Sequence, residues 1–249
     1  MKPKFMIKYG KEEHLQQLAD GKIRFAPSQT YVRLEEAQHN KGQGDLLEGK
    51  MKIKMQSARL HSIETNELIR ELPAGTMVVS LQDVNNMPVF CISQYDEHQI
   101  SDYTDELHYT ITLSDEKIGC IQNDFPEASH ALIILEPDKF INEVRNIDGH
   151  RFVSDSIRYY DYDINPLQMY MFLATGEETV QTNTVMSMTY DNRYRNLLCK
   201  DISFSQQDEY RFIEINELIT VPVFYSFLFT SRYLIVPIEQ LKKPLIIGD

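Results

Sequence analysis

Long apolar segments are missing from this chain of 249 residues. The longest candidate, "LITVPVFYSFLF" at 218–229, falls short of the roughly 18 residues that a membrane-spanning helix needs, and Pro222 interrupts it. The first residues, "MKPKFMIKYG", also lack the apolar core and the small-residue cleavage site of a signal peptide. We therefore expect a soluble, cytoplasmic protein that has no membrane partner.

Cysteine and histidine give no sign of a disulfide framework or a metal site. The three cysteines, Cys91, Cys120 and Cys199, are scattered and odd in number, which predicts neither paired disulfides nor a zinc site. The seven histidines show no spacing typical of metal ligands, such as H-x-x-x-H. We expect no metal, and nothing marks one of the cysteines as an activated nucleophile.

The common phosphate-binding and hydrolase motifs are absent too. The chain contains neither G-x-x-x-x-G-K-[ST] nor G-x-G-x-x-G, the glycine loops that cradle phosphates. It also lacks the G-x-S-x-G and H-E-x-x-H patterns of serine hydrolases and zinc proteases. Any catalytic or binding function must therefore be inferred from weaker sequence patterns that are spread along the chain.

Basic residues are fewer than acidic residues in this chain. The formal net charge is −12, from 37 acidic and 25 basic residues. A broad nucleic-acid footprint needs clustered Lys and Arg, so DNA is an unexpected partner. The first 60 residues are the exception because they carry many of the cations, Lys8 and Arg24 among them. This region is either a local basic patch or an ordinary solvated surface.

What the chain does contain is a β-rich pattern with helices early and late. Hydrophobic residues make up 42% of it, enough for a substantial core, and it has no repeats or Gly/Ser linkers. We expect residues 1–249 to form one α+β domain. The patterns predict strands at "PKFMIKYG", "KIRFAP", "PVFCISQY" and "EASHALIILEP", and helices at "KEEHLQQLADG", "PDKFINEVRNI" and "NPLQMYMFLAT".

A late segment, "ISFSQQDEYRFIEI" at 202–215, is predicted to be one more strand. Alternate residues of a strand share a face, so Gln207, Glu209 and Arg211 would point the same way. Two interpretations remain open at this point. The segment is either a half-exposed strand whose charges form ion pairs, or a rigid support for a catalytic glutamate.

Four short motifs give the chain a family resemblance. In order, they are "IKYG…HLQQLADGKIRFAP", the acidic loop "GQGDLLEG", "FCISQY" and "FSQQDEYR". Together they span most of the chain and resemble a bacterial domain-of-unknown-function family found among abortive-infection and phage-defence proteins. The family's last motif reads W-x-x-E-x-E-Y-R, where this chain has Phe204 for the tryptophan and Gln207 for the first glutamate. We expect Asp45 and Glu48 of the acidic loop to be turn and helix-cap residues, and the alternative is a loop that closes over a ligand.

This layout is in turn similar to the ADP-ribosyltransferase fold, a mixed β-sheet core with short flanking helices. The resemblance implies that NAD is the substrate and that Glu209, with Gln207 in a Q-x-E pattern, is catalytic. The fold's first strand normally supplies an Arg or His, and here Lys8 and Tyr9 stand in that place. Ser93 matches the serine of the middle strand. Arg24 and Arg211 are candidates for the pyrophosphate, which suits a guanidinium.

The implied function is an NAD-dependent ADP-ribosyltransferase-like effector, a toxin or phage-defence protein, that modifies a protein or RNA acceptor. Water as the acceptor would make it an NAD glycohydrolase, and an antitoxin or other regulatory protein is a further expected partner. One alternative is a non-enzymatic sensor or binding module on the same fold that works through a protein partner. Another is an RNA-modifying transferase guided by the basic N-terminal region.

Overall fold

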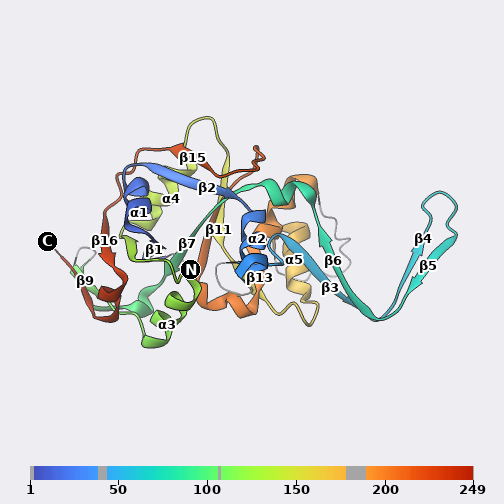
Figure 1. Cartoon of the computed structure of the whole chain (residues 1–249), viewed down its shortest axis with the longest axis horizontal. Coiled ribbons are helices and arrows are strands. Elements are labelled where there is room, and N and C mark those ends of the chain that lie inside the picture. The colour runs from blue at the N-terminus through green and yellow to red at the C-terminus, as the bar shows by residue number, and fades with distance from the viewer. Residues whose placement is uncertain (1–2, 39–43, 106–107, 178–188, 249) are drawn as a thin grey trace.

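An antiparallel sheet forms the centre of the molecule, with strand order β11-β14-β7-β1-β10-β16 (Figure 1). The computed structural model describes residues 3–38, 44–105, 108–177 and 189–248. Two more strands join beside β7, because β2 pairs with β7 and β15 pairs with β2. The strands of this sheet are β1 (Phe5–Gly10), β2 (Lys22–Pro27), β7 (Pro88–Tyr95), β10 (His130–Ile134), β11 (Phe152–Ser156), β14 (Glu209–Glu214), β15 (Val223–Ser226) and β16 (Tyr233–Pro237).

Helices cover both faces of the sheet. Met6 of β1 belongs to an apolar cluster that includes Leu15 of α1 and Phe140 of α4. Ile7, the next residue of β1, belongs to a second cluster with Ile118 of α3. Successive strand residues point to opposite faces, so apolar side chains on both faces of β1 are buried. The helices are α1 (Glu12–Ala19), α2 (Gln29–Gln38), α3 (Asp115–Asp124), α4 (Pro137–Arg145) and α5 (Leu167–Thr175), and the 3-10 helices are η1 (Gln82–Asn86), η2 (Glu97–Gln99), η3 (Tyr190–Leu198), η4 (Ile202–Gln207) and η5 (Ile238–Lys242).

The expected α+β class is confirmed, with one correction to the sheet. All strand pairs of the main sheet are antiparallel, whereas a mixed sheet was expected. Within the described residues, the one parallel pair joins β12 (Arg158–Tyr160) to β13 (Cys199–Asp201) in a small separate sheet. A three-stranded sheet is formed by β8 (Ile100–Asp105), β9 (His108–Ile111) and β17 (Leu245–Ile247).

The first helix shows how local sequence sets an element. Glu12 and Glu13 occupy the first turn of α1, where the helix dipole favours negative charge, and Leu15 and Leu18 form its buried stripe. The helix ends just before Gly21, whose φ of +79° is in the left-handed region. A Cβ at Gly21 would lie 2.3 Å from the carbonyl oxygen of Phe227, so the chain requires glycine there.

Two parts of the predicted secondary structure are wrong. Residues 202–207 form η4 rather than a strand, because the Asp201 side chain accepts a hydrogen bond from the Ser203 amide and Asp208 adopts a left-handed φ of +46°. The strand β14 therefore begins only at Glu209. Helix α3 was not predicted at all. Its polar segment has only Ile118 and Ile121 as buried apolar residues, which is too few for a clear helical period.

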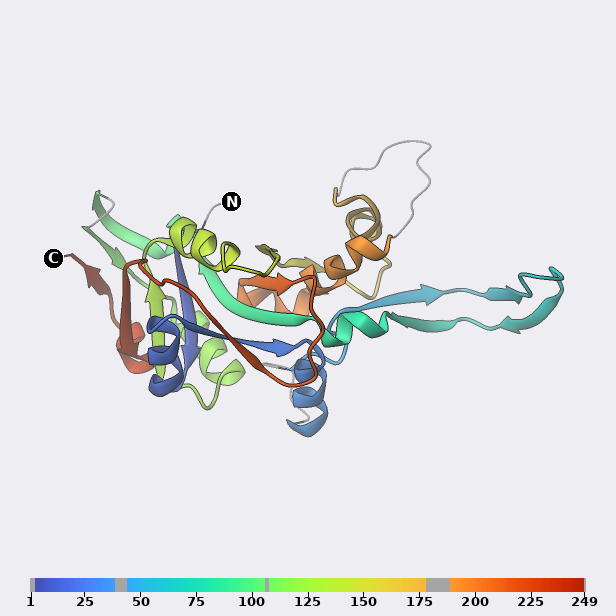
Figure 2. The ribbon, with the colours of Figure 1, turned by 90° about the horizontal axis from the view of Figure 1, so that it is seen from above.

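A long hairpin, residues 50–80, leaves the body of the molecule (Figures 1 and 2). Its inner half pairs β3 (Lys50–Met55) with β6 (Gly75–Ser80), and its outer half pairs β4 (Ala58–His61) with β5 (Leu68–Leu72). We call this segment the arm.

No helix in the described part of the chain is long and apolar enough to cross a membrane.

Candidate functional site

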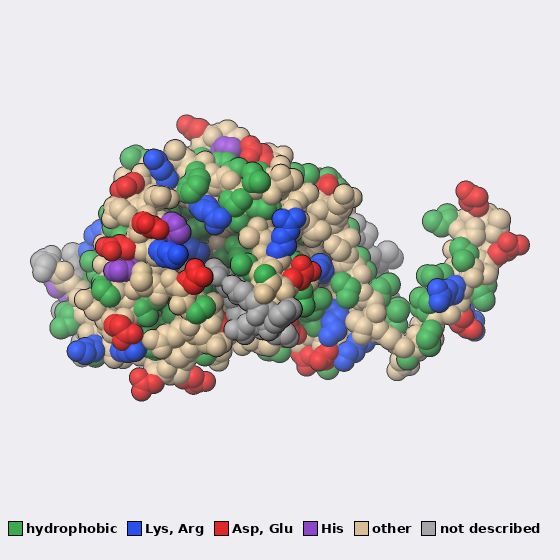
Figure 3. All heavy atoms as spheres, viewed as in Figure 1, with side chains coloured by type: hydrophobic (Ala, Val, Ile, Leu, Met, Phe, Trp, Pro, Cys, Tyr) green, Lys and Arg blue, Asp and Glu red, His purple; other side chains and the backbone are tan. Residues whose placement is uncertain are grey.

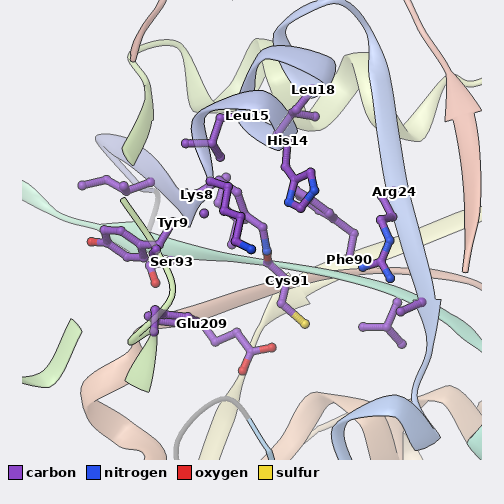
Figure 4. A pocket seen from close by; sticks show the side chains of 18 of the residues that line it. Lys8, Tyr9, His14, Leu15, Leu18, Arg24, Phe90, Cys91, Ser93 and Glu209 are labelled. Atoms are coloured by element: carbon purple, nitrogen blue, oxygen red, sulfur yellow. The ribbon is translucent and has the colours of Figure 1, made fainter. Parts of the chain in front are cut away.

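A cavity of about 610 Å³ opens where β1, α1, β2 and β7 meet (Figure 4). Small-molecule and cofactor sites usually enclose roughly 300–1,000 Å³, so this one is of ordinary size for a ligand. Six of the seven predicted site residues line it, from both ends and the middle of the chain. They are Lys8, Tyr9, Arg24, Ser93, Gln207 and Glu209.

Strand register explains why these residues meet. Ser93 of β7 lies directly opposite Ile7 of β1 on one side and directly opposite Glu209 of β14 on the other. Three positions that are far apart in sequence therefore form one row across the sheet. Lys8 and Tyr9 follow Ile7 on β1 and lie at the same cavity. The row depends on both antiparallel pairings, so a slip in either would separate Glu209 from β1.

Glu209 is the most strongly held group in the cavity. Lys200 Nζ donates to Glu209 Oε2 at 2.8 Å, and Arg211 Nε donates to Glu209 Oε1 at 2.5 Å. Burial pushes the pKa of Glu209 upward, but the charges of Arg211 and Lys200 together outweigh burial and hold that pKa below its usual range. Glu209 is therefore a fixed, ionised carboxylate at the cavity wall.

Gln207 reaches the same site from η4 rather than from the strand. Its Oε1 accepts a hydrogen bond from Lys200 Nζ at 3.0 Å, and its Nε2 donates to Asp124 Oδ2 at 3.1 Å. Gln207 and Glu209 thus share one cation, although Asp208 between them breaks the extended geometry. The interpretation of this segment as a half-exposed strand is also incorrect, because all six residues of β14 are buried.

Arg211 lies outside the cavity wall, which corrects its predicted role as a pyrophosphate ligand. It is 0% exposed, and its guanidinium is fully engaged within the protein. Nη1 and Nη2 bind the two carboxylate oxygens of Glu48, Nη1 also donates to the Leu197 carbonyl at 2.6 Å, and Nε binds Glu209. The side chain therefore positions Glu209 and has no donor group directed at a ligand.

The acidic loop supplies a residue, Glu48, whose role in the site differs from the predicted helix cap. Asp45 behaves as expected of a turn residue, since its Oδ1 accepts the Leu47 amide at 2.8 Å. Glu48 is not a helix cap, because both of its carboxylate oxygens pair with Arg211. Gly49 follows with φ of +65°, and a Cβ there would lie 2.7 Å from Val84 Cγ1, so only glycine lets the loop approach this closely.

Sequence reasoning missed Lys200, although it is central to the site. It is 4% exposed, and Glu209 and other nearby carboxylates raise its pKa even though burial opposes this. Lys8 behaves in the opposite way, because burial lowers its pKa more than Glu209 raises it. Lys8 Nζ donates to the Cys91 carbonyl at 2.6 Å and lies 4.9 Å from the centre of the Phe90 ring. Of these two buried lysines of the cavity, Lys200 is therefore firmly cationic, whereas the charge of Lys8 is less stable.

Cys91 lines the cavity beside Lys8 and Glu209 but is not arranged as a nucleophile (Figure 4). Burial and the charge of Glu209 raise the pKa of its thiol to about 12. The thiolate is the reactive form of cysteine, so this thiol stays protonated and inert at neutral pH. Its Sγ lies 3.3 Å from the hydroxyl of Tyr31 on α2.

The aromatic wall is formed by Tyr9. Its hydroxyl lies 2.5 Å from the hydroxyl of Tyr95, and its ring stacks on Phe125 with 5.4 Å between ring centres. Burial raises the pKa of Tyr9 well above its ordinary value, so the hydroxyl is neutral. The contacts with Tyr95 and Phe125 fix the orientation of the ring, and only 7% of Tyr9 is exposed.

The mouth of the cavity is positively charged on a protein whose net charge is −12. Figure 3 shows Lys, Arg and His side chains, with Asp and Glu side chains among them, around a hollow over α1, β2 and α2. Arg24 on β2 is exposed, and no described residue forms an ion pair or hydrogen bond with its guanidinium. Lys11, His14 and Lys22 also line this region, where Glu127 lies 3.7 Å from Lys11 Nζ and Glu13 lies 3.8 Å from His14 Nε2.

Comparison of the chain with family models, with curated proteins and with solved structures gave no match. Within the described residues, no group of three or more His, Cys, Asp or Glu side chains is arranged to hold a metal ion. What the site offers is a fixed carboxylate, an amide, a neutral aromatic wall and a cationic mouth. This combination suits an anionic ligand that carries a polar ring or sugar inside the cavity and a phosphate at the mouth.

Proposed function

We propose that the cavity binds NAD and that the protein is an NAD-dependent ADP-ribosyltransferase-like effector, built on an ADP-ribosyltransferase-like version of the α+β fold. The observation that carries the proposal is the meeting of Glu209, Gln207, Tyr9, Lys8 and Ser93 at one cavity. Their convergence is what a shared substrate site requires.

The reaction would break the bond between nicotinamide and ribose. The bonding electron pair leaves with the nicotinamide nitrogen, and positive charge develops on the sugar. An ionised carboxylate beside the ribose stabilises that charge as it forms, and Glu209 is held in the ionised state. A nucleophile of the acceptor, protein or RNA, then bonds to the sugar carbon and gives its proton to solvent. Water in place of the acceptor would release free ADP-ribose.

Other side chains would bind and orient NAD. Arg24, exposed at the mouth and free of partners among the described residues, would bind the pyrophosphate. The Tyr9 ring would pack against nicotinamide, and Gln207 would hydrogen-bond the ribose or the attacking group. Arg211 would act only as a positioning residue, through its hydrogen bond to Glu209.

The test compares Glu209→Gln with Glu48→Gln. Both substitutions remove one carboxylate from the cluster around Arg211, but Glu48 does not line the cavity. Titration calorimetry would measure NAD binding, and chromatography would measure nicotinamide release. We expect Glu209→Gln to bind NAD and to release nicotinamide at least about 100-fold more slowly, the usual effect of losing one electrostatic contact to a transition state. In Glu48→Gln, the rate of nicotinamide release should fall much less than in Glu209→Gln.

Two results would overturn this function. One is a wild-type protein that neither binds NAD nor releases nicotinamide with cell extract supplied as a source of acceptors. The other is an equal loss in both variants, which would show that only the integrity of the ionic cluster matters. Circular dichroism of both variants, at a temperature below their unfolding transitions, confirms that folded proteins are being compared.

A non-enzymatic sensor on the same fold is the second candidate, and one observation favours it. Lys200 and Arg211 both bind Glu209, so two positive charges already compensate the carboxylate that would stabilise the sugar cation. A sensor would bind NAD or a related nucleotide without releasing nicotinamide. Growth arrest on expression in a bacterial host would then persist in Glu209→Gln, whereas an enzyme would lose it.

A further inference from the structure

The arm carries a different kind of surface from the cavity. Figures 1 and 2 show residues 50–80 extending away from the body, with no other described element beside β4 and β5. At about 3.3 Å per residue, twelve residues of strand reach roughly 40 Å. Large apolar side chains are exposed along this length, among them Leu60, Leu68, Ile69, Met77 and Val78. Such exposure on an extended ribbon marks an interaction surface.

The two faces of the outer half of the arm differ, and one of them carries most of its aliphatic side chains. Arg59 and Glu71 are cross-strand partners and form an ion pair on one face, with Nε and Oε1 at 2.7 Å. Ala58 and Leu72 form the neighbouring register pair, and their side chains lie on the opposite face together with Leu60, whose cross-strand partner is Arg70. This apolar face packs against no other described element, since β4 and β5 pair only with each other.

A two-stranded ribbon of this kind is marginally stable in water, and a third strand or a covering layer is normally needed. The outer half leaves the edges of β4 and β5 unpaired, and the inner half leaves the edge of β6 unpaired, because each half is a sheet of two strands within the described chain. The edge of β3 is occupied at Lys54, whose N–H and C=O both bond to the Asn165 side chain. Unpaired edges present rows of N–H and C=O groups to any strand that can align with them. The arm therefore lacks a layer and at least one neighbouring strand.

The distribution of charge along the arm indicates which partner supplies the missing neighbouring strand. The inner half, residues 50–56 and 73–80, carries Lys50, Lys52 and Lys54 and no acid. Lys52 and Lys54 share a single carboxylate, Asp163, so positive charge remains in excess. The outer half, residues 57–72, has three glutamates against two arginines. A second arm that runs in the opposite direction would place its acidic outer half against this basic inner half.

We propose that the arm pairs with the arm of a second copy of this chain, edge to edge and antiparallel, to form a two-fold dimer. Each arm then supplies a strand beside the open edges of the other, and the apolar side chains of each outer half gain cross-strand neighbours. A two-fold interface uses the same surface on both copies, which is what an arm with opposite charges at its two ends can provide. This proposal is independent of NAD and of the cavity.

Sedimentation velocity of the full chain tests the proposal. From about 1 to about 100 µM, we expect the wild-type protein to shift from monomer to dimer, as a micromolar interaction would. Leu60→Lys puts a charge on the apolar face of both arms at once and should weaken the dimer at least tenfold. The matched control is Leu228→Lys, an exposed leucine on the body, 80% accessible, which should leave the dissociation constant unchanged.

Charge reversal tests the direction of pairing. Glu67→Lys makes the outer half basic, so it should weaken the dimer by repelling the lysine row of the partner, while Asp148→Lys at an exposed turn on the body should not. A wild-type protein that stays monomeric across the range overturns the proposal. So does a dimer that is equally stable in Leu60→Lys and Glu67→Lys. Unfolding transitions of the variants, compared with wild type, show that the body remains folded.

Discussion

Lys200 Nζ lies 2.8 Å from Glu209 Oε2, and their side chains are only 5% and 7% exposed. The same ammonium also binds Gln207 Oε1 at 3.0 Å. One buried cation therefore fixes both members of the Q-x-E pair, and Arg211 holds Glu209 from the other side. Because these charges are removed from water, each depends on the others for its stability.

The Arg211 guanidinium should be the most costly of these groups to remove. Arg211→Met would leave both carboxylate oxygens of Glu48 buried without a cation, since Arg211 binds them both. Breaking a buried ion pair from one side typically costs about 3–5 kcal/mol. We expect a loss of this size in the free energy of unfolding, measured by urea denaturation. A loss below about 1 kcal/mol would show that water reaches the cluster.

The stability due to Glu209 should depend on pH. Its pKa in the folded protein is held below its ordinary value of 4.5, so the unfolded chain takes up the proton first on acidification. The contribution of Glu209 is therefore complete above pH 4.5 and is lost as the pH falls through the folded-state pKa. Urea denaturation should show that the difference in unfolding free energy between wild type and Glu209→Gln holds between about pH 7 and about pH 4.5 and shrinks from about pH 4.5 to about pH 3. A constant difference over this range would contradict the assignment.

Arg24 should affect ligand binding and leave stability unchanged. Its guanidinium is exposed and has no ion pair among the described residues, so Arg24→Ala should change the unfolding free energy by less than about 0.5 kcal/mol. A lost charged hydrogen bond to the pyrophosphate costs about 1.5–3 kcal/mol, or roughly a 10- to 100-fold weaker affinity for NAD. Titration calorimetry provides the measurement. Arg151→Ala, which removes another exposed arginine, is the control and should bind as wild type does.

The three cysteines should differ in reactivity towards iodoacetamide. Cys91 is half-buried and has a thiol pKa of about 12, and Cys199 is 3% exposed. Cys120, half-buried on α3, should therefore be alkylated first at pH about 8, because only the thiolate of an accessible cysteine reacts quickly. Mass spectrometry of a time course would identify the sites. Alkylation of Cys91 as fast as that of Cys120 would contradict the prediction that the Cys91 thiol is unreactive. As a control, all three cysteines should react in denaturant.

Local patterns were sufficient for several elements. The acids and the two leucines of α1, the proline that opens α4, and the short apolar runs of β1, β7 and β10 all act within a few residues. Their predictions are confirmed for that reason. Helix α3 was missed because its apolar residues are few, and β14 was predicted too long because the turn at Asp208 depends on a single left-handed residue.

The sequence by itself determined the class of the fold and the candidate residues, because strand alternation, caps and short motifs are encoded over neighbouring positions. Only the tertiary structure decided which of these residues meet. The register of β7 against both β1 and β14 aligns Ile7, Ser93 and Glu209, and a contact across 163 residues pairs Glu48 with Arg211. No local pattern carries such information, since it depends on the packing of whole strands. For the same reason, the structure turned Arg211 from a proposed ligand into the buried support of Glu209.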